Sequence, residues 1–446
     1  MDLKNSWYIM KDLKGINKNF RGKILRNKTI ITNFSFLSIF QIFALLSPLI
    51  TYPYLIRVVG LEKYGVVIFA QALVSYFSLI INFGFNISGP KDVAICRNEH
   101  KTLSEFVSSI YIIKSLLWVL CFIVYMALIF SSDFFHDNLI VYIFTFFITL
   151  NDVFFPAWFF QGIEKMKYIT YVNLFVRSLF IIAIFILIKG PSDYVFIPLL
   201  NSVGALIGGV ISTYLVFKKE GVDFIHVPKA LIFIRFKEGV TLFISTISQQ
   251  VYLYMNKLII GKFLGMQEVT IYDLAEKITL IMKTLIGTIA QATFPKISRE
   301  KSISYINKVM LLVVSLVALI YLIIFFTSGQ VVLFFTGQEL PVAKSIIRIL
   351  GLSAIFIGFN VFLGGNRLIP FGFNKQYMFI TVANSGVYLL CIASLFLFDI
   401  INIYTITITF VFVEAFCFAL LSLTNKKLKL LWVDLTNEHP QYEGFR

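Results

Sequence analysis

Ten ionisable side chains interrupt long apolar stretches of this sequence, and they are the residues best suited to do chemistry. A charged side chain costs about 2.5–3.5 kcal/mol at the centre of a membrane-spanning helix on insertion scales, so such residues usually face an interior cavity or each other. Cations in a cavity attract phosphate-bearing ligands, and acids can bind a proton or a sodium ion. The ten are Lys114, Asp152, Arg177, Lys257, Asp273, Glu276, Lys277, Lys283, Arg348 and Glu414.

The cations in this set are candidates for binding an anionic substrate. Arg177 is the best candidate for a phosphate, because a guanidinium donates to two oxygens at once and stays protonated. The candidate substrate-binding residues are Arg177, Lys283, Lys114, Lys257, Lys277 and Arg348.

The acids have two alternative roles. They can bind a coupling ion, or they can form interhelical ion pairs that fix the packing. Two acid–base sets are expected nearest mid-depth, Asp152 with Arg177 and Glu414 with Lys283, and both roles stay open for them. The acidic candidates are Asp152, Glu276, Asp273 and Glu414.

The stretch 270–295 concentrates this charge. Asp273 and Lys277 are four residues apart and can pair on one helix face, while Glu276 and Lys283 follow nearly the same stripe. A helix surrounded by lipid would not carry these four charges. We therefore expect this helix to line the interior.

The elements that must position these residues are membrane-spanning helices. The 446-residue chain is 58% hydrophobic and only 14% charged, against about 25% charged in soluble chains. A span needs about 20 mostly apolar residues, and the runs lack the alternation of barrel strands. The expected spans are 30–56, 66–88, 107–130, 139–163, 168–189, 195–217, 239–261, 270–295, 305–328, 345–368, 376–398 and 402–423.

The distribution of Lys and Arg predicts the topology. Most of them fall in alternate loops and in the two ends of the chain, which predicts that both termini are cytosolic. A weak internal match between residues 60–71 and 265–276 predicts two six-helix bundles related as parallel repeats around a central cavity. The expected units are a cytosolic tail (1–29), a first bundle (30–217), a central cytosolic loop (218–238), a second bundle (239–423) and a cytosolic tail (424–446).

Several chemistries are missing from the sequence. There is no phosphate-binding G-x-x-x-x-G-K-[ST] loop, no H-E-x-x-H motif and no metal-ligand spacing among the four cysteines. No basic, aromatic-rich hydrophilic domain indicates nucleic-acid binding. We therefore expect a protein that is not an enzyme and needs no cofactor or metal, with coupling to a H⁺ or Na⁺ gradient as an open alternative.

Several segments resemble a known family. The most specific is Trp-Phe-Phe-Gln-Gly-Ile-Glu-Lys-Met-Lys at 158–167; Asn256 departs from the pattern, because the family often has Asp before the lysine. The family is the O-antigen or repeat-unit flippases of the multidrug/oligosaccharidyl-lipid/polysaccharide exporter superfamily. The other matching segments are 52–65, 69–71, 83–89 with 93–94, and 272–277.

The resemblance implies a substrate, a place and partners. The substrate would be an undecaprenyl-diphosphate-linked oligosaccharide, made on the cytosolic face of the bacterial inner membrane for O-antigen or a related surface polysaccharide. Membrane lipids would be partners, and so would a polysaccharide polymerase with its chain-length machinery. The fold would be two six-helix bundles around a cavity that is often cationic.

These observations predict alternating access, with the diphosphate near Arg177 and Lys283 and the prenyl chain in lipid between the bundles. Two other functions are weighed against this one. A cation-coupled drug exporter of the same superfamily would share the fold, but a cationic cavity repels cationic cargo. An intramembrane glycan polymerase would need a substantial outer loop, and the expected outer loops are short.

Overall fold

The computed structural model describes residues 32, 35–36 and 38–430, and within them every regular element is a helix. The expected cytosolic tail 1–29 and the end of the expected tail 424–446 lie outside the described residues. The first helix, Ser38–Val59, is followed by α2 (Leu61–Asn82), α3 (Phe85–Cys96), α4 (His100–Phe130), η1 (Asp133–Asn138), α5 (Leu139–Phe147), α6 (Leu150–Phe154), α7 (Ala157–Gly162), α8 (Met166–Leu187), η2 (Pro191–Val195), α9 (Phe196–Tyr214) and η3 (Leu215–Lys219).

The second part of the chain is built from longer helices. They are α10 (Lys229–Phe263), α11 (Met266–Glu300), α12 (Ile303–Thr336), α13 (Pro341–Asn360), η4 (Val361–Leu368), α14 (Asn374–Leu397) and α15 (Ile403–Lys427). The central loop expected at 218–238 is shorter than predicted, because α10 already begins at Lys229. Similarly, α15 continues to Lys427, into the stretch expected to be a tail.

Eleven helical segments of the described chain are long and apolar enough to cross a membrane. The remaining expected span, 239–261, falls within α10. This helix has 35 residues and, at 1.5 Å per residue, is long enough to cross, but it is not one of the eleven. The prediction of an all-helical membrane protein is confirmed.

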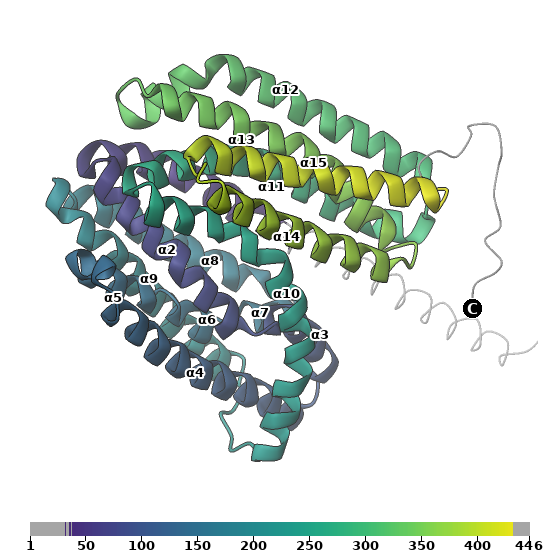
Figure 1. Ribbon diagram of the computed structural model, residues 1–446. Helices are drawn as coiled ribbons and strands as arrows, with labels where there is room; N and C mark the ends of the chain where they lie inside the picture. The colour runs from purple at the N-terminus through teal and green to yellow at the C-terminus, as the bar shows by residue number, and fades with distance from the viewer. Residues whose placement is uncertain (1–31, 33–34, 37, 431–446) are drawn as a thin grey trace, which may run out of the picture.

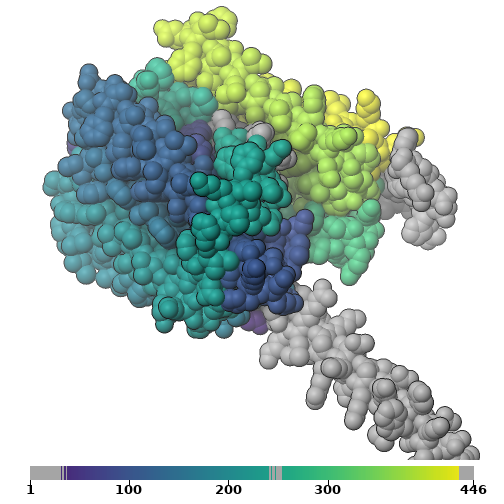
Figure 2. Space-filling model, turned by 90° about the horizontal axis from the view of Figure 1, so that it is seen from below, coloured from purple at the N-terminus to yellow at the C-terminus, as the bar shows by residue number. Residues whose placement is uncertain are grey.

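The helices gather according to their order in the chain (Figure 1). Helices α2 to α9 lie on one side, α11 to α15 lie on the other, and α10 runs between them. Figure 2 shows α10 from below, in teal between the blue helices of the first half and the yellow-green helices of the second. That the two halves are related as parallel repeats stays a prediction.

The two matched segments of the chain make similar turns. Gly60 precedes α2 with φ 87°, and Gly265 precedes α11 with φ 124°. Side chains with a Cβ rarely adopt such φ values, so glycine suits both turns. These turns place α2 and α11 against each other.

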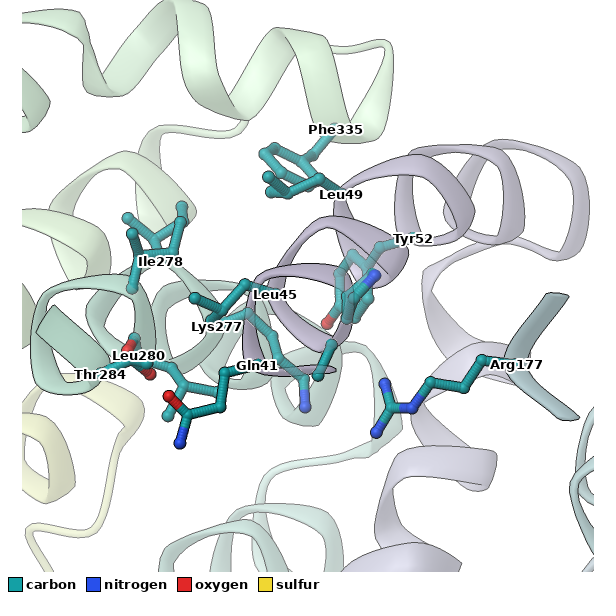
Figure 3. A pocket seen from close by; sticks show the side chains of 13 residues that line it. Gln41, Leu45, Leu49, Tyr52, Arg177, Lys277, Ile278, Leu280, Thr284 and Phe335 are labelled. Atoms are coloured by element: carbon teal, nitrogen blue, oxygen red, sulfur yellow. Dashed lines mark hydrogen bonds between the residues drawn. The ribbon is translucent and has the colours of Figure 1, made fainter. Parts of the chain in front are cut away.

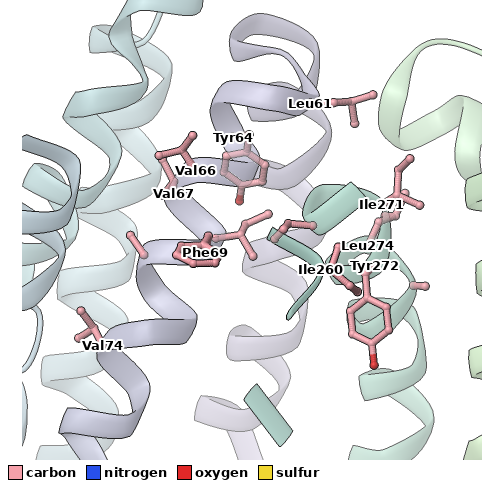
Figure 4. Packing of buried hydrophobic residues seen from close by; sticks show 14 of the residues in the cluster. Leu61, Tyr64, Val66, Val67, Phe69, Val74, Ile260, Ile271, Tyr272 and Leu274 are labelled. Carbon is pink, nitrogen blue, oxygen red and sulfur yellow. The ribbon is translucent and has the colours of Figure 1, made fainter. Parts of the chain in front are cut away.

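The contact between α2 and α11 forms the centre of the core (Figure 4). Leu61, Tyr64 and Phe69 of α2 belong to the same buried cluster as Ile271 and Tyr272 of α11. A Cβ added at Gly65 would lie 1.8 Å from the carbonyl oxygen of Met266, so the two backbones meet here directly. Small residues that allow such close approach are typical of helix packing in membranes.

Candidate functional site

A polar cavity of about 510 Å³ lies mainly among the helices of the first half. Its volume falls in the range of roughly 300–1,000 Å³ that is typical of ligand pockets. The first helix, α2, α5, α6, α8 and α9 line it, and α11 supplies two further side chains. Its polar and charged lining residues are Ser47, Thr51, Tyr52, Tyr64, Gln71, Ser75, Ser78, Thr145, Thr149, Asn151, Asp152, Asn173, Arg177, Asn201, Asp273 and Lys277.

A second, apolar cavity of about 380 Å³ adjoins the first and shares Pro48 and Tyr52 of the first helix with it (Figure 3). The first helix and α11 form most of its walls. Among the described residues, Arg177 and Lys277 are the only charged ones that line it. The other lining residues are Gln41, Ala44, Leu45, Pro48, Leu49, Tyr52, Ile278, Leu280, Ile281, Thr284 and Phe335.

Arg177 and Lys277 line both cavities and therefore mark the place where the two spaces meet. Figure 3 shows their charged ends pointing into the same space from α8 and α11. The guanidinium of Arg177 lies 5.6 Å from the centre of the Phe40 ring. Neither cation makes an ion pair with any residue that the structure describes, so both are available to an anionic ligand.

Lys257 of α10 neutralises the acids of α11. Its ammonium lies 2.5 Å from Asp273 and 2.6 Å from Glu276, and Lys257 is only 8% exposed. The hydroxyl of Tyr52 donates to Asp273 at 2.7 Å, which ties the first helix to α11. The expected pair is thus corrected: Asp273 forms its ion pair with Lys257, and Lys277 is left facing the cavities.

Asn256, the departure from the family pattern, takes part in a buried network next to this lysine. Its amide nitrogen donates to the hydroxyl of Tyr272 at 2.7 Å, and its amide oxygen accepts from the hydroxyl of Tyr388 at 2.5 Å. A carboxylate could only accept, so an amide matches these two hydroxyls with one donor and one acceptor.

Asp152 is held by neutral donors at the edge of the polar cavity. Its carboxylate accepts from Ser78 at 2.5 Å and from Asn82 at 2.9 Å. Lys114, which is 1% exposed, donates to the amide oxygen of Asn82 and to the backbone oxygen of Asp152, both at 3.0 Å.

The chain break at Pro156 explains the contact with Lys114. In an uninterrupted helix the carbonyl of Asp152 would accept from the N–H of residue 156, but proline has none. The fourth span is accordingly divided into α5, α6 and α7. The free carbonyl accepts from Lys114 instead, and the alternative of an Asp152–Arg177 ion pair is not formed among the described residues.

Three of the predicted site residues lie away from both cavities. Glu414 accepts from Asn360 at 2.9 Å, and Lys283 lies 5.0 Å from the centre of the Phe410 ring. Glu414 and Lys283 form no ion pair in the part of the chain that the structure describes. Arg348 donates to the backbone of Phe325 at 3.0 Å and to Ser328 at 2.9 Å, both on α12.

The structure therefore brings together only part of the predicted set. Arg177, Lys277, Asp273 and Asp152 line the polar cavity, with Lys257, Glu276 and Lys114 bonded behind them. Lys277 occupies the place beside Arg177 that the sequence analysis assigned to Lys283. Both lysines lie on α11, and helix periodicity alone could not predict which of them faces the cavities beside Arg177.

Sequence reasoning missed three asparagines of the polar cavity. Asn151, Asn173 and Asn201 line it from three different helices. The available signal was an amide within an apolar run. This signal is not specific, because amides that lie outside the cavity, such as Asn256 and Asn360, share it. Tyr52 was also missed, because a tyrosine near the end of a span is usual at the membrane surface.

Comparisons with known proteins place the chain among relatives of similar sequence and fold. Two curated bacterial proteins named "Putative O-antigen transporter" are similar to this chain: one of Shigella dysenteriae, 26% identical over 77% of this chain and 87% of its own length, and one of Escherichia coli K12, 25% identical over 79% and 86%. Two solved structures share the fold. They are the lipid II flippase MurJ in an inward closed conformation (TM-score 0.67, 15% identity, 88% of this chain and 89% of that one) and an inward-facing MATE family transporter of the MOP superfamily (TM-score 0.65, 14% identity, 86% and 94%).

A family model described as "Polysaccharide biosynthesis protein" matches residues 30–301, more than half of the sequence. The chain belongs to this polysaccharide biosynthesis protein family.

Proposed function

We propose that this protein flips undecaprenyl-diphosphate-linked oligosaccharides from the cytosolic to the periplasmic leaflet of the bacterial inner membrane. One observation carries the proposal: Arg177 and Lys277 stand where an apolar cavity meets a polar one. In the proposed substrate, the diphosphate likewise stands between an apolar prenyl chain and a polar glycan. The curated relatives, named for O-antigen transport, support the same substrate class.

The charges of the apolar cavity favour an anionic cargo. Arg177 and Lys277 line it without an acid, while Asp273 is neutralised by Lys257. An arginine donates to two phosphate oxygens at once, and a lysine adds a point charge. An amphipathic cation, the cargo of the alternative drug exporter, would meet repulsion here.

Transport would proceed by alternating access, with both termini in the cytosol. The Tyr52–Asp273 hydrogen bond and the α2–α11 packing contact join helices of the two halves. These helices would move apart when the cavity opens to the opposite side of the membrane. A H⁺ or Na⁺ gradient is the proposed energy source, and a polysaccharide polymerase with its chain-length machinery would use the product.

Substitution of Arg177 in a strain deleted for the native gene tests the proposal. Deletion should trap lipid-linked repeat units on the cytosolic side and abolish surface polysaccharide, and the intact gene should restore it. Arg177→Lys should restore part of the polysaccharide and Arg177→Gln little, at equal protein levels in the membrane. Normal polysaccharide with Arg177→Gln, or trapping of single units on the outer side, would overturn the proposal.

A further inference from the structure

Three amide side chains of the polar cavity have no hydrogen-bond partner among the residues that the structure describes. Gln71 of α2, Asn151 of α6 and Asn201 of α9 line the cavity, and none forms a side-chain hydrogen bond with any described residue. Inside a membrane an unsatisfied polar group costs several kcal/mol. Convergence of three such groups from three helices on one cavity indicates a polar ligand.

The chemistry of these groups matches hydroxyls rather than phosphate. Each amide offers both donors and an acceptor, and a hydroxyl likewise donates and accepts. Asp152 lines the cavity next to Asn151. Each of its carboxylate oxygens accepts one hydrogen bond from the protein and can accept another from an O–H group of a ligand. A phosphate only accepts, so this carboxylate would repel it.

The arrangement is confined to one half of the molecule. Of the second-half side chains that the structure describes, only Asp273 and Lys277 line the polar cavity. Among second-half amides whose side chains the structure describes, Asn256 bonds Tyr272 and Tyr388, and Asn360 bonds Glu414. The amides that line the polar cavity therefore all come from the first half.

We infer that the polar cavity is a glycan-binding subsite, in which Gln71, Asn151, Asn201 and Asp152 hold the hydroxyls of the sugars next to the diphosphate. This inference rests on the proposed function and gives the substrate an orientation. The sugars lie within the first half, the diphosphate lies between Arg177 and Lys277, and the prenyl chain enters the apolar cavity between the first helix and α11.

Binding of two lipids that differ only in the glycan tests the subsite. The full chain is placed in nanodiscs and its occupancy measured by native mass spectrometry. One probe is undecaprenyl diphosphate, and the other is the lipid-linked repeat unit extracted from the source strain deleted for this gene. Asn151→Leu combined with Asn201→Leu should weaken binding of the repeat-unit lipid about tenfold, because two hydrogen bonds are lost, each worth about 0.5–1.5 kcal/mol.

The same double variant should bind undecaprenyl diphosphate within about twofold of the wild type, which also shows that it is folded. Gln338→Leu, an amide replaced in an exposed loop, should change neither affinity. Equal binding of the repeat-unit lipid by the double variant and the wild type would overturn the subsite alone. Loss of both lipids to the same degree would also overturn it, and failure of the wild type to bind either lipid would overturn the proposed function.

Discussion

Lys257 is the residue on which the charge balance of the second half depends. It lies between the carboxylates of Asp273 and Glu276, and Asp273 in turn accepts from Tyr52 on the first helix. Without the ammonium, two carboxylates would face each other in a buried place. The lysine thus stabilises the packing of α10, α11 and the first helix together.

Replacing Lys257 by methionine keeps most of the volume and removes the charge. We expect Lys257→Met to destabilise the folded state by about 3–5 kcal/mol, the cost of leaving a buried ion-pair partner without its cation. Denaturant titration in mixed micelles measures this free energy of unfolding. Lys257→Arg should lose less, and a loss below about 1 kcal/mol in Lys257→Met would contradict the assigned role.

Lys277 and Lys283 provide a matched pair for testing which cation meets the substrate. Both lie on α11, but only Lys277 lines the cavities. Lys277→Gln should reduce surface polysaccharide at least tenfold, since an interaction with a charged group is worth roughly 1.5–3 kcal/mol. Lys283→Gln should retain most of it; the reverse order, in cells with equal amounts of each variant, would show that the diphosphate binds elsewhere.

At the scale of elements, the contact between α2 and α11 depends on the lack of a side chain at one position. A Cβ at Gly65 would collide with the backbone of Met266, and Thr270 nearby donates to the carbonyl of Leu61. Here two helices from different halves of the sequence approach as closely as their backbones allow. This close approach holds Asp273 within reach of Tyr52.

We expect Gly65→Val to push α2 and α11 apart and to destabilise the protein by about 1–3 kcal/mol, as overpacking does. The midpoint of thermal unfolding in detergent gives the effect. Gly287→Ala is the control, because a Cβ there meets nothing within 4 Å and should leave the midpoint unchanged or raise it. Equal midpoints for Gly65→Val and the wild type would disprove the direct backbone contact.

At the scale of the whole molecule, the proposed topology places the loop before α10 in the cytosol and the loop after α12 in the periplasm. His226 and Gln338 are exposed in these two loops. In a background without native cysteines, Gln338→Cys should react with a membrane-impermeant maleimide in intact cells. His226→Cys should react only after permeabilisation, and the opposite pattern would invert the topology.

The sequence was sufficient to predict the helices, because apolar length and the placement of Lys and Arg are local properties. It also predicted that Arg177 and Lys277 face the interior. It could not predict that Lys257 rather than Lys277 pairs with Asp273, since three helices decide this together. The partners of Asp152 depended in the same way on how Pro156 divides the fourth span.

The first helix borders two cavities of different character. Pro48 and Tyr52 line both of them, and Pro48 lacks the N–H that would bind the carbonyl one turn earlier. The first helix therefore lacks one internal hydrogen bond close to the place where the two cavities meet. A bend at Pro48 would widen the opening between the cavities around a bound headgroup while the helices on either side keep their places.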